Sequence, residues 1–261
     1  MYVQAQTHII HVYMDEYHLL PMLRLLQQFY LLGAGDFYLE FISRVDYGFL
    51  TAPAEVSNGW LQEEFNNCVH RTSLACQSEF ISEHIRLNRL RALSPFDIWK
   101  SSFFTVECEA NLRVIFSKSV MAKYEQIFAM LMSLKTQSFV MQRIWIDQCG
   151  LSKELDRIGI SDIESVLDTF NLLRMKIQSF LTTLQNFYFL HIIDKLYNNL
   201  LSKLKNVNRF DDVLELHNEY VDSLCHYFFV NGGSETIKQL ISDLLEQSRL
   251  FVGLQVGFDL F

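Results

Sequence analysis

The chain has 261 residues, of which 50% are apolar and 20% charged, a composition typical of a globular protein and not of a disordered one. It contains only 3 prolines and 10 glycines, which argues against sandwiches, barrels and propellers, because these folds need a turn every ~8–12 residues. The formal net charge of -8 argues against nucleic acid as the main partner, because phosphate binding needs a surplus of lysine and arginine.

Helical spacing of apolar residues predicts a series of helices in the first third of the chain. The expected helices cover residues 3–18, 19–33, 37–45, 60–70 and 73–93. Pro21 suits the first turn of the second helix, and Asp36 is expected to cap the third. The segment 46–58 contains Gly48 and Pro53 and is therefore expected to be a loop.

Two short segments in the middle of the chain, IWKSSFFTVEC and NLRVIFS, alternate apolar and polar residues. The alternating apolar positions are Phe104 and Val106 in the first segment and Leu112, Val114 and Phe116 in the second. A period of two is typical of strands. We therefore expect short strands, or an extended pair, between the helical blocks.

A long helix is expected after these segments. It begins at Ser117 or Ser119, either of which would cap it, and it runs to about Cys149, where Gly150 ends it. A polar loop is expected over residues 150–160.

The last third of the chain is also expected to be helical. Ser161 and Glu164 form a capping box for a helix that reaches about Lys205, which the pair Thr182-Thr183 could interrupt. The final two helices are expected over residues 210–230 and 234–256.

These patterns together predict an all-α fold: an elongated helical bundle with a short extended or β-hairpin insertion near residues 98–117. Residues 1–97 would form an N-terminal helical sub-bundle and residues 98–261 a C-terminal helical bundle. No linker or repeat separates the two parts, so they are expected to form one continuous domain.

The cysteines and the N-terminus indicate the cellular compartment. The five cysteines are scattered and form no Cys-x-x-Cys pair, which favours free thiols in a reducing compartment. The N-terminal sequence has neither the basic region nor the uninterrupted apolar core of a secretory signal, and no apolar run approaches the ~18 residues that span a membrane. We expect a soluble, cytosolic protein without direct membrane insertion.

Four polar residues near the N-terminus are candidate metal ligands. His8, His11, Asp15 and His18 share one face of the predicted helix, and imidazole with carboxylate can bind zinc. Ligands spread over three helical turns cannot all reach one ion, so at most two neighbours would bind. The alternative is a polar helix face near a chain end, and we expect no metal and no cofactor.

Other catalytic patterns are weak. His217 could act as a base, but no serine or cysteine nucleophile stands out by motif, and a hydrogen-bonded helix residue is the simpler interpretation. The segment Gly33-Ala34-Gly35 lacks the third glycine and the Lys-Ser/Thr of a phosphate loop. The sequence therefore predicts a protein that is not an enzyme.

Four blocks of the sequence resemble, in order, the C-terminal half of the gamma-tubulin complex protein family. The first is LLPMLRLLQQFYLLGAGDFYLEFI, with the turn Leu31-Leu32-Gly33-Ala34-Gly35-Asp36-Phe37. The second runs from Trp99 to Trp145 and matches at Tyr124, Ile127, Phe128, Leu131, Leu134 and Lys135. The third is LLRMKIQSFLTTLQNFYFLHIID, and the fourth is RFDDVLELHNEYVDSL, which matches at Asp212, His217 and Tyr220.

The resemblance implies an all-helical domain that binds gamma-tubulin, within a ring that templates microtubule nucleation, and it implies no catalytic chemistry. Partners would be gamma-tubulin and other gamma-tubulin complex proteins, in the cytoplasm and at a microtubule organising centre such as the centrosome or spindle pole. Ala110-Asn111-Leu112 replaces the Trp-Pro-Leu that is usual in the family, which suggests a divergent member. Family members are also much longer, and the half that makes their lateral contacts has no counterpart in this sequence.

The gamma-tubulin contacts are expected in the middle of the chain. Residues 98–160 carry eight basic and six acidic side chains, a net charge of +2, whereas the segments on either side are each at -5. Tubulins are acidic, so this basic stretch would attract them. The expected contact residues are Lys123, Phe128 and Lys135, followed by Lys118 and Arg113. The alternatives are that Phe128 belongs to the apolar core stripe and that the lysines form a solvated face.

Two other classes of function stay open at this point. Long helices without motifs are also typical of helical adaptors, such as subunits of membrane-tethering or transport complexes unrelated to tubulin. A metal-dependent enzyme would instead use the polar face that includes His8 and His18.

Overall fold

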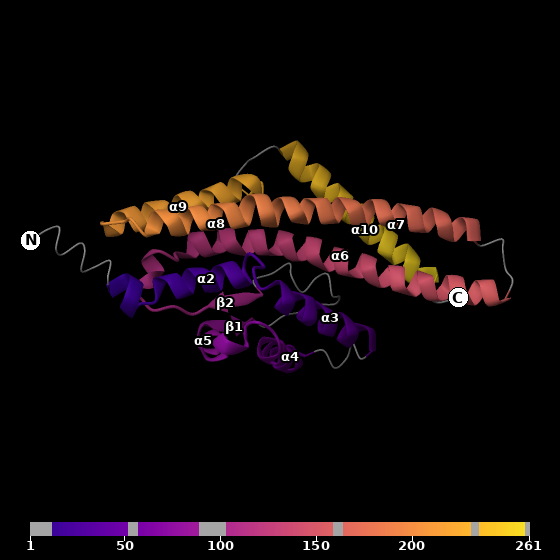
Figure 1. Cartoon of the computed structure of the whole chain (residues 1–261), viewed down its shortest axis with the longest axis horizontal. Helices are drawn as coiled ribbons and strands as arrows, with labels where there is room; N and C mark the ends of the chain where they lie inside the picture. The colour runs from indigo at the N-terminus through magenta and orange to yellow at the C-terminus, as the bar shows by residue number, and fades with distance from the viewer. Residues whose placement is uncertain (1–11, 52–56, 89–102, 159–163, 231–234, 259–261) are drawn as a thin grey trace, which may run out of the picture. The chain divides into compact units, whose positions relative to one another are not determined.

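The computed structural model describes residues 12–51, 57–88, 103–158, 164–230 and 235–258. Helices dominate these residues, and their β structure is one two-stranded sheet (Figure 1). The predicted all-α fold with a small strand pair is confirmed. Within the same ranges, every helix is too short or too polar to cross a bilayer.

The α-helices are α2 (Leu19–Phe29), α3 (Gly35–Thr51), α4 (Asn58–Arg71), α5 (Ser78–His84), α6 (Lys118–Ile158), α7 (Glu164–Asn186), α8 (Asp194–Leu204), α9 (Phe210–Tyr227) and α10 (Glu235–Phe258). Two π-helices are η1 (Val12–Glu16) and η6 (Phe187–Ile193). Two 3₁₀-helices are η3 (Ala75–Gln77) and η5 (Leu112–Val114), and the strands are β1 (Ile85–Leu87) and β2 (Phe104–Val106).

The chain packs as two units. Unit 1 consists of residues 1–132 and 192–233, and unit 2 of residues 133–191 and 234–261. Contacts within unit 1 link residues on both sides of the position between residues 97 and 98. The ring of Tyr30, the residue just after α2, for example, lies 6.0 Å from the ring of Phe128 on α6, measured between ring centroids.

The core of unit 1 is a cluster of aromatic side chains. Phe29 of α2 lies within 5.9 Å, between ring centroids, of Phe37, Phe65 and Phe104, which come from three other elements. The Tyr30 hydroxyl donates to the Phe104 carbonyl at 3.1 Å, so the polar tip of this buried tyrosine is satisfied. Edge-to-face aromatic pairs add ~0.5–1.5 kcal/mol each beyond the area that they bury.

The small sheet belongs to the same core. Arg86 on β1 pairs with Thr105 on β2 in antiparallel register, which confirms the strand predicted around Phe104. The helix predicted over residues 73–93 ends instead at His84, because residues 85–87 supply the partner strand.

The second predicted strand, around Leu112, is wrong. Residues Leu112–Val114 form a 3₁₀-helix. Leu112, Ile115 and Phe116 are buried whereas Val114 is 58% exposed, so burial follows a helical turn and not an alternation.

Two predicted loops are shorter than expected because helices extend into them. Helix α3 continues to Thr51, and α4 begins at Asn58, where the Ser57 hydroxyl accepts a hydrogen bond from the Trp60 backbone N–H at 3.2 Å. Helix α6 passes through Gly150 and ends at Ile158. A glycine costs a helix only ~1 kcal/mol relative to alanine, which a helix of 41 residues tolerates.

The helix predicted from Ser161 to Lys205 is split into three elements. Its start at Ser161 lies outside the described residues. Thr183 donates its hydroxyl to the Ser179 carbonyl at 2.8 Å inside α7, a bond that a helix accommodates. The interruption is the π-helix η6, which begins at Phe187.

Helices α8 and α9 of unit 1 lie side by side (Figure 1) and form an αα-hairpin with a short connection. Asp211 and Asp212 occupy the first turn of α9, where a negative charge is favourable.

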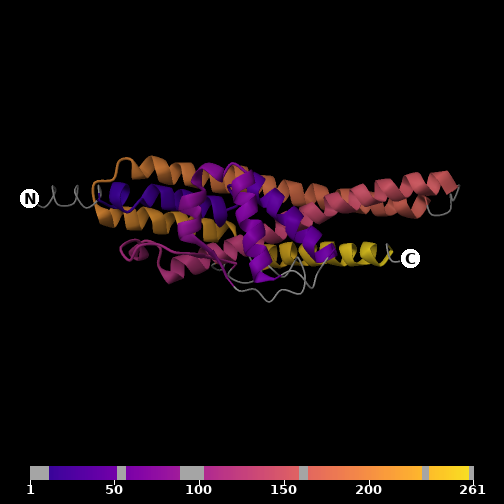
Figure 2. The same cartoon turned by 90° about the horizontal axis from the view of Figure 1, so that it is seen from below.

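Unit 2 contains the second part of α6 together with α7 and α10. Side-chain hydrogen bonds link α6 to α7: Gln178 Nε2 donates to Ser138 Oγ and Gln185 Nε2 to the Leu134 carbonyl, both at 2.9 Å. The two helices run side by side in both views (Figure 2).

Candidate protein-binding surface

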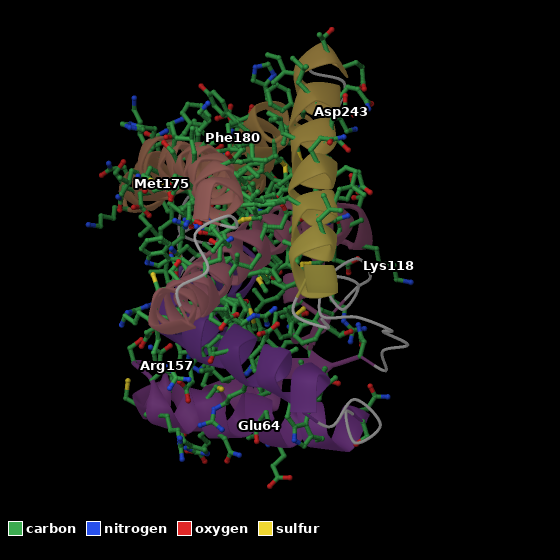
Figure 3. All side chains as sticks on the ribbon, turned by 90° about the vertical axis from the view of Figure 1, so that its right-hand side faces the viewer. Glu64, Lys118, Arg157, Met175, Phe180 and Asp243 are labelled. Atoms are coloured by element: carbon green, nitrogen blue, oxygen red, sulfur yellow. The ribbon has the colours of Figure 1, made fainter. Side chains whose placement is uncertain are left out.

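Helix α6 begins with a lysine that has no ion-pair partner among the described residues. The Ser117 hydroxyl accepts from the Val120 backbone N–H at 3.4 Å, so the helix starts at Lys118, as predicted. Lys118 is exposed, and its side chain extends away from the ribbon in Figure 3. The first turn of α6 contains no acidic residue, so lysine and helix dipole present the same sign of charge.

Arg113 adds a second cation just before this helix start. It belongs to η5 and its side chain is exposed. Both groups are on unit 1, and together they favour an anionic partner.

Lys123 is placed differently, because its charge is used within the chain. Its Nζ lies 2.6 Å from Oδ1 of Asp222 on α9, and 29% of the lysine side chain and 60% of the aspartate side chain are exposed. The ion pair joins α6 to α9 inside unit 1. The sequence could not identify Asp222 as the partner, since the two residues are 99 positions apart.

Phe128 points into the core and is 2% exposed. Its ring lies 5.3 Å from Phe104 and 6.0 Å from Tyr30. Of the two interpretations of this residue, the structure shows the apolar core stripe. Phe128 is not on a surface that a partner could reach without rearrangement of unit 1.

Lys135 lies on α6 in unit 2 and is half-buried. Burial lowers the pKa of its ammonium group from the ordinary value, since a charge loses hydration in a protein environment. Among the described residues, no carboxylate forms an ion pair with it. An anionic group of a partner would restore favourable interactions for this cation.

His217 lies in the core of unit 1 and not in a cleft. It is 2% exposed, and its Nε2 lies 3.2 Å from the Tyr124 hydroxyl. Burial lowers its pKa to about 4, so the imidazole is neutral near pH 7. A neutral, enclosed imidazole joins α9 to α6 and has no access to a substrate, which agrees with the structural interpretation.

The candidate metal ligands near the N-terminus are only partly visible. His8 and His11 lie outside the described residues, as does the side chain of Asp15. His18 is exposed and takes a left-handed backbone conformation, with φ at 53°, just before α2. In the described part of the chain, no three His, Cys, Asp or Glu side chains are grouped as a metal site.

Sequence reasoning missed an apolar surface on unit 2. Trp145 and Ile146 of α6 are 45% and 68% exposed. The Arg174 guanidinium lies 4.5 Å from the centre of the Trp145 ring, a cation–π contact. Exposed large apolar residues elsewhere on unit 2 are Val166, Leu172, Leu173, Met175, Phe187, Leu190, Ile237, Leu240, Leu244, Leu250 and Leu254.

A signal for this surface is present in the sequence. The helices of unit 2 carry more apolar residues than one buried stripe needs, and the run Ile144-Trp145-Ile146 occupies neighbouring faces of α6. Where such residues lie together, exposed apolar surface marks a protein interaction site.

Comparison with known proteins assigns the chain to a family. The family model described as gamma tubulin complex component C-terminal matches residues 19–259. Similar curated proteins include gamma-tubulin complex component 3 of Drosophila melanogaster, 22% identical over 232 residues that make up 88% of this chain and 25% of the relative. Component 4 of Mus musculus is 19% identical over 243 residues, 85% of this chain and 35% of the relative.

Component 3 of Arabidopsis thaliana is 20% identical over 250 residues, 93% of this chain and 30% of the relative. The chain thus spans between 25% and 35% of the length of these three relatives.

Proposed function

Since the chain belongs to the gamma tubulin complex component C-terminal family, we propose that it binds gamma-tubulin as a non-enzymatic scaffold subunit of a microtubule-nucleating complex. The observation that carries the proposal is the family match over residues 19–259. The resemblance predicted from four sequence blocks is confirmed by this match. The other gamma-tubulin complex components are the expected further partners, in the cytoplasm at a microtubule organising centre.

The electrostatic part of the proposed interface lies at the start of α6. Lys118 and Arg113 are exposed cations, next to a helix N-terminus without an acidic residue in its first turn. Charged groups of this kind govern the rate and orientation of association more than its final affinity. Lys123 takes part to a smaller extent, because Asp222 already neutralises it.

The apolar part of the proposed interface belongs to unit 2. Ile146 and Trp145 are large, exposed and carried on the same helix as Lys135. Buried aromatic and aliphatic anchors supply most of the binding energy at protein interfaces. We infer that these side chains are covered when gamma-tubulin binds, and that Lys135 then meets an anionic group of the partner.

The direct test measures binding of the 261-residue chain to purified gamma-tubulin by biolayer interferometry. The titration is repeated at several salt concentrations. Specific binding with an association rate that falls as salt rises is the expected result, because steering by charge is screened by ions. The proposal would be overturned by a chain that circular dichroism shows to be folded but that does not bind gamma-tubulin. That result would favour the alternative of a helical adaptor unrelated to tubulin.

A further inference from the structure

Unit 1 contains an open pocket that the proposed gamma-tubulin interface does not use. It has a volume of about 840 Å³ and lies between the start of α2, the end of α8 and the region of η3 and α5. A volume of this size is in the upper part of the ~300–1,000 Å³ range of ligand pockets. The residues that matter for its chemistry are Met14, Leu20, Arg24, Phe80, Leu201 and Lys205.

The walls of the pocket are apolar, but its charged groups have a single sign. Arg24 and Lys205 are exposed cations, and no lining side chain is acidic. Within the described ranges, neither cation has an ion-pair partner. The pocket therefore combines a floor of uncharged, mainly apolar lining residues with a rim of two exposed cations, Arg24 and Lys205, that have no ion-pair partner among the described residues.

The backbone at the pocket strengthens this positive potential. Leu20 and Pro21 line the pocket and lie in the first turn of α2, which has no acidic residue and no side-chain cap. The N-terminus of a helix carries roughly half a positive elementary charge. Anionic groups are therefore favoured at this position for two independent reasons, the side chains and the helix.

The chain enters α2 through an unusual backbone. Met14 reaches the pocket from the π-helix η1, and His18 follows with φ at 53°. π-Helical turns are rare and frequently occur at functional sites, and strained non-glycine residues cluster at ligand-binding segments.

The shape of the pocket favours one of two ligands that combine apolar and anionic groups: the acyl chain of a lipid or an acidic amphipathic helix. The pocket is open to solvent, so a bound molecule would have one face against the lining residues and one face in water. An acyl chain is apolar all round, so the side that the pocket leaves uncovered would stay in contact with water. An amphipathic helix has one apolar face and one polar face, and it binds in such grooves through residues at i, i+3, i+4 and i+7.

We propose that this pocket is a docking site for an acidic amphipathic helix of a partner protein. Apolar side chains of that helix contact Met14, Leu20 and Leu201 at the floor. Its carboxylates pair with Arg24 and Lys205 at the rim.

The test uses a fluorescein-labelled synthetic peptide with leucines at helical i, i+3, i+4 and i+7 spacing and glutamates on the opposite face. Fluorescence anisotropy with the full chain should show binding about tenfold tighter than for two control peptides. One control has the same composition in scrambled order, and the other has lysine in place of every glutamate. Equal binding of either control, or no binding of the acidic peptide, would overturn the proposal.

Variants of the chain locate the binding. Combined Arg24→Glu and Lys205→Glu substitutions should weaken binding about tenfold or more, whereas Lys195→Glu, an exposed lysine of α8 outside the pocket, should have less than about a twofold effect. Leu20→Asp should abolish binding without unfolding α2, because aspartate suits the first turn of a helix. Leu39→Asp is its matched control, since Leu39 is 52% exposed on α3 of the same unit and outside the pocket.

A direct readout of occupancy comes from ¹³C-methyl methionine spectra. The Met14 methyl signal should shift during the peptide titration, and that of Met175, exposed on α7 and labelled in Figure 3, should not. A fluorescent palmitate analogue serves as the competing ligand. If it shifts the Met14 signal and the acidic peptide does not, the pocket binds an acyl chain and the proposal is wrong.

Discussion

The Lys123 ammonium on α6 lies 2.6 Å from the carboxylate of Asp222 on α9, and this ion pair joins positions 99 residues apart. Among the described residues, it is the one lysine expected at the gamma-tubulin interface that has an ion-pair partner within the chain. Because both side chains are partly exposed, water and salt screen the attraction, and such pairs contribute only ~0.2–1 kcal/mol.

A double-mutant cycle of Lys123→Ala and Asp222→Ala should therefore give a coupling free energy of ~0.2–1 kcal/mol for unfolding. The measurement is urea denaturation followed by circular dichroism, at low and at high salt. The coupling should shrink at high salt. A coupling above about 3 kcal/mol would show that the pair is more deeply buried in solution than its exposure indicates.

Reversing the exposed charges at and just before the start of α6 should slow gamma-tubulin binding. Combined Lys118→Glu and Arg113→Glu substitutions are expected to reduce the association rate about tenfold at low salt and to change the dissociation rate less. Interferometry against immobilised gamma-tubulin measures both rates. The control is Lys195→Glu, which reverses an exposed charge on α8 and should bind as the wild type does.

The apolar part of the proposed interface makes a separate prediction. Ile146→Asp should weaken gamma-tubulin binding by ~2 kcal/mol or more, about 30-fold, by removing an anchor and adding a charge that must be desolvated. Ile146 is 68% exposed, so the free energy of unfolding should change by less than about 0.5 kcal/mol. The control is Leu190→Asp, at a position that is 61% exposed on η6 of the same unit. It shows whether the loss of binding comes from a contact at Ile146 or from adding a charge anywhere on this surface. Equal losses in the two variants would contradict an anchor at Ile146.

Phe128 should affect stability and not binding chemistry. Phe128→Ala removes a ring that is 2% exposed, and such deletions cost ~3–5 kcal/mol by lost burial and the cavity left behind. Urea denaturation checks this value, with Phe187→Ala, 43% exposed, as the surface control. If Phe128→Ala left stability unchanged but abolished gamma-tubulin binding, Phe128 would be a contact residue after all.

The buried imidazole of His217 predicts a pH dependence of stability. Burial lowers its pKa to about 4, whereas an unfolded histidine titrates near ~6.5. The unfolded state therefore binds more protons between these values, so the free energy of unfolding should fall as pH drops from about 6.5 to about 4. The loss would be up to about 3 kcal/mol, at 1.36 kcal/mol per pKa unit.

The matched variant for this experiment is His217→Gln, which keeps a polar partner for the Tyr124 hydroxyl but does not titrate. Protonation of carboxylates also destabilises the fold in acid, and this contribution is the same in the wild type and in the variant. The difference between the two pH profiles, measured by thermal or urea unfolding, isolates the histidine. Parallel profiles over this pH window would contradict a depressed pKa at His217.

Helices with one clear apolar stripe could be predicted from the sequence. The starts of α2 and α6 agree with the expected ones, because Pro21 and Ser117 are local signals that act within one turn. Two features could not be predicted from such signals. The strand Ile85–Leu87 exists because Phe104–Val106 pairs with it, and η6 interrupts the predicted helix at Phe187 without a glycine or proline to mark it.

The candidate site divides in the same way. The sequence by itself determined the helical class, the basic middle segment and the order of the four family blocks, since these depend on composition and on spacing along the chain. Only the tertiary structure decided that Phe128 faces inward, that Asp222 neutralises Lys123, and that Arg24 and Lys205 share one pocket. Burial and charge pairing depend on residues brought together from distant positions, and a one-dimensional pattern does not contain that information.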